Sequence, residues 1–345
     1  MLKKLQKIIR NFKNKPANDY ESMPETGGSI QNWRHLKELQ LYKDNDYALT
    51  SLENGFDLDA SGFTPQKKEA EKTIYHCYWF GAIGRKQAFS IKSFLCTQDL
   101  SKCRVILWLD QDNGFENHEQ NPLLKAILPL IEVRSYDPFL EMKETPWKNN
   151  KNLVTESENL AKRSDGFRFL VLFKYGGVYF DLDVMFLKDF GSLRDSEFCY
   201  AWESQPFANS ALLRLNRQSL ISTYILHKSI AKHTVLPWVI LNYSDALLKD
   251  LYVFPCAFFD PVWQGEGLEN SPLEDFPDFF KPFDRKFINK FDIDSYKKFF
   301  TGCYAYHWHN QWKAEEVENS FFGIFENEFN EQLMIPSAAP ELLVF

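Results

Sequence analysis

Carboxylates, an arginine and two glycines recur at short, fixed spacings between residues 164 and 183. Asp165 and Arg168 are three residues apart, so on a helix their side chains share one face. Gly176-Gly177 is typical of a helix end, where one residue usually takes a left-handed conformation. The residues after the glycines favour a strand. Its alternation would point Asp181 and Asp183 the same way.

Two carboxylates on one side of a strand end are oxygen ligands of the kind that Mg²⁺ and Mn²⁺ prefer. Such an ion keeps several coordination positions for water or substrate phosphates. Taken alone, an Asp-x-Asp such as Asp181-Leu182-Asp183 is more often a solvent-exposed strand end than a metal site. The combination with Asp165, Arg168 and the glycine pair favours a binding site.

The whole run resembles the sugar-binding DXD region of retaining glycosyltransferases that use nucleotide sugars. This group includes the yeast initiating mannosyltransferases, the clostridial glucosylating toxins and the globotriaosylceramide-synthase-type α-galactosyltransferases. Their pattern is Ser-Asp, an arginine three residues on, Gly-Gly-x-Tyr and then Asp-x-Asp, and this chain matches it at every position, with Tyr179 as the tyrosine. The resemblance implies a GT-A-type nucleotide-sugar-binding fold, a UDP-sugar donor, Mn²⁺ or Mg²⁺ as cofactor, and retention of configuration.

The same resemblance implies roles for individual residues. Asp181 and Asp183 would hold the metal, and Asp165 and Arg168 would orient the donor sugar. The families end their catalytic core with Ala-x-His-x-Trp. Here Ala305 and His307 match, which makes His307 a third metal ligand or a diphosphate contact.

At the position of the family tryptophan this chain has His309. The departure leaves open whether Trp308 or Trp312 lines the pocket. His309 itself is a further candidate metal ligand.

Further candidates follow from position along the chain. Trp79 or Phe80 ends the first expected strand and would lie near the uracil ring, with core packing as the alternative. Tyr179 and Asn209 are further candidates for donor contact, and a turn asparagine is the alternative for Asn209. Glu203 is the candidate carboxylate near the reacting carbon.

Alternating strand and helix patterns predict an α/β fold with a mostly parallel central sheet flanked by helices. We expect strands over 73–81, 104–110 and 131–136 and a helix over 86–97. Asp110-Gln111-Asp112 is a second D-x-D, but it lacks the helix and glycine context and is interpreted as a polar loop. Residues 137–150 are expected to form a loop that closes over the sugar.

Composition sets limits on the class of protein. With 44% hydrophobic and 25% charged residues the 345-residue chain has an ordinary globular balance. A net charge of -7 argues against a nucleic-acid partner, which requires a basic face. The six cysteines include no C-x-x-C pair and are expected to be reduced thiols.

The start of the chain is different in character. Residues 1–30 form a basic amphipathic segment and linker, followed by one GT-A-like domain over 31–345, with its nucleotide-sugar core at about 73–250 and acceptor-side elements at about 251–345. Residues 1–15 would give an N-terminal helix, either a peripheral membrane contact or a solvated terminus. We expect no signal peptide or spanning helix, a bacterial origin, and a cytoplasmic location, at the cytosolic membrane face if residues 1–15 bind it.

These features predict a metal-dependent glycosyltransferase that moves a hexose or N-acetylhexosamine from a UDP-sugar to a glycan or glycolipid acceptor, such as surface polysaccharide, capsule or lipooligosaccharide. Two alternatives stay open. One is a toxin-like effector that glycosylates a host protein. The other is a non-catalytic carbohydrate-binding relative.

Overall fold

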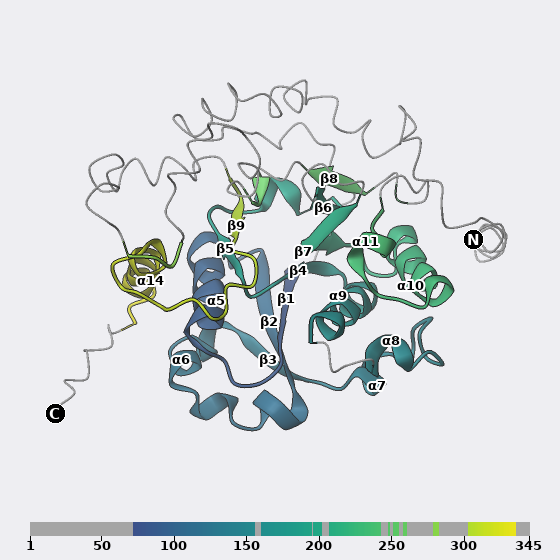
Figure 1. Ribbon diagram of the computed structural model, residues 1–345, viewed down its shortest axis with the longest axis horizontal. Coiled ribbons are helices and arrows are strands. Elements are labelled where there is room, and N and C mark those ends of the chain that lie inside the picture. The colour runs from purple at the N-terminus through teal and green to yellow at the C-terminus, as the bar shows by residue number, and fades with distance from the viewer. Residues whose placement is uncertain are drawn as a thin grey trace, which may run out of the picture.

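The fold is known here from a computed structural model (Figure 1). It describes residues 72–155, 160–194, 196–201, 207–242, 248, 251–254, 258–260, 279–282 and 303–335. The expected N-terminal segment, residues 1–30, and the candidate carboxylate Glu203 lie outside these ranges.

A mixed, mostly parallel sheet forms the centre of the described chain (Figure 1). Its strand order is β3-β2-β1-β4-β7-β6-β8, and only β7 runs against the others. A second, small sheet pairs β5 with β9. The strands are β1 (Thr73–Trp79), β2 (Cys103–Asp110), β3 (Glu132–Tyr136), β4 (Gly177–Phe180), β5 (Val184–Phe186), β6 (Phe198–Ala201), β7 (Ala208–Leu215), β8 (Tyr252–Phe254) and β9 (Ala305–His307).

Helices cover both faces of the central sheet. In Figure 1, α5, α6 and α14 lie on one side of the sheet, and α9, α10 and α11 lie on the other. The helices are α5 (Arg85–Thr97), α6 (Pro122–Lys125), α7 (Pro138–Glu141), α8 (Asn152–Thr155), α9 (Leu160–Tyr175), α10 (Leu220–Lys232), α11 (Pro237–Ile240) and α14 (Phe321–Gln332). This confirms the predicted α/β class with a mostly parallel sheet.

Alternate residues of the central strands face two different cores. Tyr75 and Cys77 of β1 belong to the core on the α5 side, whereas Tyr78 packs with Phe167 of α9 in the core on the other side. This is the period of two that a strand buried on both faces imposes. A third cluster packs α14 against α5 around Phe89.

The topology creates a switch point between β1 and β4. From β1 the chain moves outward through β2 and β3, and it then returns through α9 to place β4 on the opposite side of β1. In open α/β sheets, ligands bind at such a point, outside the carboxyl ends of the strands. Trp79 ends β1 and Asp181 follows β4, so this edge carries the candidate site.

Two local expectations need correction. Strand β4 ends at Phe180, so Asp181 and Asp183 lie in the turn to β5 and not on the strand itself. The expected closing loop at 137–150 is instead packed onto the core through fully buried Trp147.

The cysteines behave as expected where they are described. Cys77, Cys96, Cys103, Cys199 and Cys303 are free thiols. Within the described ranges, no helix has both the length and the apolar character that a membrane span requires.

The glycine pair allows α9 to meet β4 in so short a turn. Gly176 and Gly177 have φ of +68° and +103°, and a Cβ on Gly177 would lie 2.1 Å from the carbonyl oxygen of Ile74. Both the left-handed φ and the close approach of β1 therefore require glycine.

We predict that Gly177→Ala lowers the free energy of unfolding by about 2 kcal/mol or more, because strain and overlap add. Urea unfolding measures it. Gly84→Ala is the matched control, since its Cβ would meet only the flexible end of the Gln87 side chain. Equal losses in the two variants would contradict the close-approach argument.

Candidate active site

The turn that contains Asp181 and Asp183 is held at the carboxyl end of β4 by backbone hydrogen bonds. The Asp181 amide donates to the Ala211 carbonyl of β7 at 2.8 Å, and the Val184 amide donates back to the Asp181 carbonyl at 3.1 Å. Strand β5 then pairs with β9, which sets Val184 opposite His307. Two segments that are far apart in the sequence therefore meet at this turn.

Asp183 is held by the turn that follows β9. Its carboxylate Oδ2 lies 3.2 Å from His307 Nε2 and accepts a hydrogen bond from the Asn310 amide at 2.7 Å. Its carbonyl accepts from the Trp308 amide at 3.0 Å. Asn310 reaches Asp183 because it has φ of +56°.

Arg168 of α9 contacts carboxylates from both ends of the predicted motif, Asp165 on the helix and Asp181 after β4. Its guanidinium lies 3.3 Å from the Asp165 carboxylate and 3.1 Å from Asp181 Oδ1, and it donates to the Ser210 hydroxyl at 2.6 Å. The Tyr179 hydroxyl also donates to Asp181 Oδ1. Any metal contact of Asp181 must therefore use Oδ2 or displace one of these donors.

Burial makes the charges of this cluster interdependent. Burial raises the pKa of Asp181 and outweighs the lowering by Arg168, with Asp183 adding to the rise. Burial also opposes ionisation of Asp183, but His307 lowers the pKa of that carboxyl below its usual range. Burial alone would lower the pKa of His307, yet Asp183 raises it to about 9. Without a bound cation, His307 and Asp183 form an ion pair.

The second ring nitrogen of His307 is also bound. Its Nδ1 lies 2.9 Å from the hydroxyl of Tyr200, a fully buried residue of β6. A hydrogen bond at one nitrogen fixes the orientation of a histidine and decides which nitrogen faces a metal. Here Nε2 faces the aspartates.

Asp181, Asp183 and His307 fit a divalent ion. One ligand atom of each lies within 4.8 Å of the others. Two carboxylate oxygens and one imidazole nitrogen suit Mn²⁺, and imidazole is a softer donor than Mg²⁺ favours. A cation here would also offset the two buried carboxylates. Because a metal-bound imidazole must be neutral, binding would release the His307 proton.

The predicted aromatic residues separate into two environments. Trp79 and Trp312 are partly buried and touch, with ring centroids 4.8 Å apart. Trp308 is fully buried in the α14–α5 cluster, against Phe89 and Phe279. Trp308 has no exposed surface that a ligand could contact. Of the two tryptophans predicted to line the pocket, the geometry therefore favours Trp312.

Phe80 and Asn209 sit in well-defined surroundings. The Arg163 guanidinium lies 4.8 Å from the centre of the Phe80 ring. Asn209 lies in strand β7 and not in a turn, and its Oδ1 accepts a hydrogen bond from the Ala211 amide at 2.8 Å. Contact of Asn209 with the sugar donor stays a prediction, as does the role of Glu203 as the carboxylate near the reacting carbon.

Sequence reasoning missed several supporting residues. Lys86 of α5 is buried, and its ammonium donates to the carbonyls of Gln311 and Ala314 at 2.6 and 2.5 Å, so it anchors the segment after His309. Asp110, set aside as part of a loop, is the buried end of β2 and pairs with Arg163 at 2.5 Å. No sequence pattern marks these contacts, because each joins elements distant in the chain.

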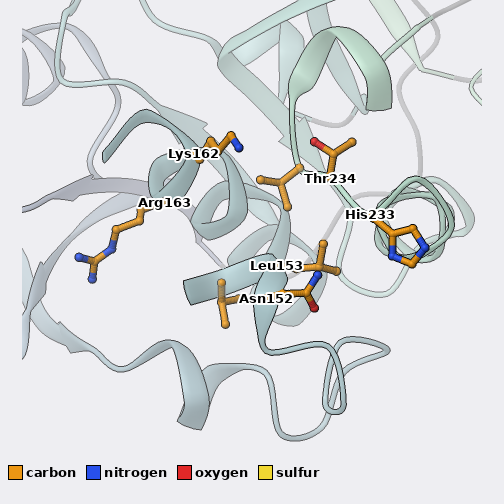
Figure 2. A pocket seen from close by; sticks show the side chains of 8 residues that line it. Asn152, Leu153, Lys162, Arg163, His233 and Thr234 are labelled. Atoms are coloured by element: carbon orange, nitrogen blue, oxygen red, sulfur yellow. The ribbon is translucent and has the colours of Figure 1, made fainter. Parts of the chain in front are cut away.

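Two hollows are found in the described part of the chain, and neither is lined by Asp181, Asp183 or His307. One, lined by residues of α8, α9 and the α10–α11 connection, is shown in Figure 2, where the Arg163 side chain points away from Asn152 and His233. The other, of about 270 Å³, is lined by Ile83 and Leu109 near the ends of β1 and β2. Arg163 is thus turned toward Phe80 and Asp110.

Comparison with known families decides the assignment. Residues 30–199 match the family described as glycosyltransferase sugar-binding region containing DXD motif. This matched region belongs to the family. The matched residues include β4 and the turn with Asp181 and Asp183, which is the DXD motif of that description. A comparison with curated proteins finds no significant match.

Solved structures of other glycosyltransferases are similar at low identity. PaToxG glycosyltransferase shares 18% identity at a TM-score of 0.43, covering 61% of this chain and 79% of its own. The galactosyltransferase LgtC, in complex with donor and acceptor sugar analogues, shares 12% at 0.40, covering 78% and 98%. Apo GlyE from Streptococcus pneumoniae TIGR4 shares 12% at 0.42, covering 77% and 61%. The family assignment rests on the sequence match.

The buried carboxyl of Asp165 gives a prediction about pH. Burial raises its pKa to about 7 in spite of Arg168. The folded state thus keeps a proton that the unfolded chain loses near pH ~4. The contribution of Asp165 to the free energy of unfolding therefore falls as the pH rises from about 4 to about 7.

We predict that Asp165→Asn removes this dependence, so that between pH 5 and pH 8 the variant gains on the order of 2–4 kcal/mol relative to wild type. Urea unfolding at both pH values measures the gain. Glu119→Gln, at an exposed carboxylate, is the control. A constant difference between Asp165→Asn and wild type across the two pH values would show that Asp165 is ionised throughout.

Proposed function

We propose that this glycosyltransferase moves a hexose or N-acetylhexosamine from a UDP-sugar to a glycan acceptor, depends on Mn²⁺, and retains the anomeric configuration. The observation that carries the proposal is the convergence of Asp181, Asp183 and His307 at the switch point of the sheet. Arg168 and Asp165 adjoin this cluster directly.

Different residues of the chain would bind the sugar and the base of the donor. Asp165 and Arg168 lie on one face of α9 and would hydrogen-bond sugar hydroxyls, with the Arg168 fork fixed in direction by Ser210 and Asp181. Trp79 ends β1 and Phe80 follows it, and either one would face the base. Orientation of this kind lowers the barrier before any bond changes.

Cleavage of the donor leaves negative charge on the β-phosphate. A divalent ion held by Asp181, Asp183 and His307 would supply Lewis-acid stabilisation of that charge. Arg168 adds a permanent positive charge, because its guanidinium is not deprotonated in proteins.

Retention has two possible routes. In front-face attack, the departing phosphate accepts the proton of the acceptor hydroxyl. In double displacement, a carboxylate attacks the anomeric carbon first. We favour the front-face route, because Asp165, Asp181 and Asp183 are each engaged by Arg168 or His307.

The acceptor proposal is a surface polysaccharide, capsule or lipooligosaccharide, glycosylated in the cytoplasm at the inner face of the membrane. Contact with the membrane through residues 1–15 belongs to this proposal. Its support is the basic amphipathic sequence of that segment.

The first test is hydrolysis of UDP-Gal, UDP-Glc, UDP-GlcNAc and UDP-GalNAc, followed as UDP release with and without Mn²⁺. We predict metal-dependent turnover with at least one donor. Asp183→Asn should lower it by about two orders of magnitude or more, since the lost charge stabilisation is several kcal/mol.

Asp137→Asn is the matched control, because Asp137 caps the distant helix α7 and asparagine also caps helices. It should turn over as wild type does. If Asp183→Asn also retains full metal-dependent turnover, the metal assignment fails. A wild-type protein that binds UDP-sugars without releasing UDP would support the non-catalytic alternative.

A second test concerns stereochemistry. With an α-linked UDP-hexose, we predict that the hexose first released by hydrolysis is the α anomer, because a retaining site delivers the nucleophile to the same face. Proton NMR in the first minutes, before mutarotation, resolves the two anomers. Initial appearance of the β anomer would establish inversion.

A further inference from the structure

Within the described ranges, His307 belongs to two groups of side chains that could hold a metal ion. The first is the cluster with Asp181 and Asp183. The second consists of Asp260, His307 and His309, with one ligand atom of each within 4.8 Å of the others. Asp260 and His309 are not part of the first group, so the second group is a separate set of ligands beside it.

Asp260 is brought to this place by a segment that lies beside β9. The Tyr304 amide, just before β9, donates to the Phe258 carbonyl at 2.7 Å. The Asp260 carboxylate is fully buried and is hydrogen-bonded to His309 Nε2. The imidazoles of His307 and His309 lie 4.0 Å apart, centroid to centroid. A buried carboxylate and two imidazoles therefore converge next to the DXD cluster.

The exposed fractions of the three side chains give the second group a floor and an opening. Asp260 and His307 are 0% and 6% exposed, whereas His309 is 33% exposed. A cation from solvent would therefore arrive on the His309 side. It would replace the hydrogen of the Asp260–His309 hydrogen bond, because metal ligands bind in their deprotonated form.

The ligand types of the second group differ from those of the DXD cluster. The DXD cluster offers two carboxylates and one imidazole, whereas the second group offers one carboxylate and two imidazoles. Two histidines and one carboxylate form a known ligand set of zinc sites that keep a fourth position open. Imidazole suits Zn²⁺, and carboxylate suits Mn²⁺. The second group is therefore the better zinc site of the two.

The shared histidine prevents both groups from holding a complete site together. A neutral imidazole has one nitrogen that can accept and one that carries a proton. The Nδ1 of His307 already lies 2.9 Å from the Tyr200 hydroxyl. His307 can therefore complete only one of the two sites at a time.

We propose that Asp260, His307 and His309 form a second cation site that takes Zn²⁺, and that its occupation excludes Mn²⁺ from the DXD cluster. The consequence for activity rests on the proposed function. Zn²⁺ at the second site would deprive the DXD cluster of its imidazole and slow the release of UDP.

Binding of Zn²⁺ at the DXD cluster itself is the competing explanation. Divalent zinc generally binds a given set of nitrogen and oxygen ligands more tightly than Mn²⁺ does. Displacement of Mn²⁺ alone therefore does not separate the two explanations. They differ in the number of imidazoles on the zinc ion, two against one, and in the dependence on Asp260.

The experiment titrates the Mn²⁺-loaded full chain with Zn²⁺ and follows released Mn²⁺ by its EPR signal. We predict that one Mn²⁺ leaves for each Zn²⁺ bound. X-ray absorption at the zinc edge then counts the imidazoles on the bound zinc, and wild type should show two. One imidazole would place the zinc at the DXD cluster and overturn the inference.

Variants of each group separate the two sites by affinity, measured by calorimetry. Asp260→Asn and His309→Gln should each weaken Zn²⁺ binding by at least about 10-fold, since even partners behind metal ligands change affinity by about 10–100-fold. Asp260→Asn should bind Mn²⁺ as wild type does. Asp181→Asn should show the reverse pattern, with weakened Mn²⁺ binding and Zn²⁺ binding close to that of wild type.

His233→Gln is the matched control, because His233 also has a left-handed φ, of +52°, but lies exposed at the end of α10. It should bind both ions as wild type does. Unchanged Zn²⁺ affinity in Asp260→Asn, or Zn²⁺ that binds without releasing Mn²⁺, would overturn the inference and leave the proposed function intact. If Asp260→Asn does not fold, His309→Gln and the imidazole count of wild type decide.

Failure of the proposed function has a different signature. Wild type that binds Zn²⁺ through two imidazoles but binds no Mn²⁺ would overturn the proposed metal dependence and keep the second site. Wild type that binds neither ion would overturn both.

Discussion

Two carboxylates held close together repel each other, and the contacts around Asp181 and Asp183 offset that repulsion. Burial removes most of the water that would screen them, so each needs a positive partner. Arg168 serves Asp181 from α9, and His307 serves Asp183 from β9. Each carboxylate thus has its own positive partner, and the two partners come from different elements, α9 and β9.

This arrangement depends on two joints of the fold. The glycine pair turns the chain from α9 into β4 within two residues, so that Arg168 and Asp181 meet although they belong to different layers. The small β5–β9 sheet aligns Val184 with His307 and brings the last described strand to the DXD turn. Lys86 then holds the following segment through backbone carbonyls. The site is therefore assembled from elements that lie far apart in the sequence. Only two of its parts, helix α9 and the turn after β4, are close to each other in the sequence.

The local parts were predictable from the sequence. The run from Asp165 to Asp183 has its own helix, stop and strand signals, and the structure has α9, Gly176-Gly177 and β4 in that order. The parallel sheet followed from alternating strand and helix patterns. The end of β4 at Phe180 was missed, because a carboxylate close to the end of a strand looks the same in sequence whether it lies on the strand or in the turn after it.

The contacts made across the chain were not predictable. Tyr200 reaches His307 over 107 positions, and Asp260 reaches His309 over 49. A buried tyrosine and an isolated aspartate carry no periodic signal, and their partners are chosen by tertiary packing. The burial of Trp308 is of the same kind, since Ala-x-His-x-Trp spacing says nothing about which face α14 will cover.

The two positive partners differ in what happens when a cation enters. His307 can release its proton and become a neutral ligand. The bound cation would then supply the positive charge that the imidazole loses. Arg168 stays charged at any pH a protein tolerates. It remains on Asp181 and near Asp165 through every protonation state of the cluster. In the proposed site, a sugar held there would meet the fixed charge of Arg168, and Asp181 and Asp183 would remain available to hold a cation.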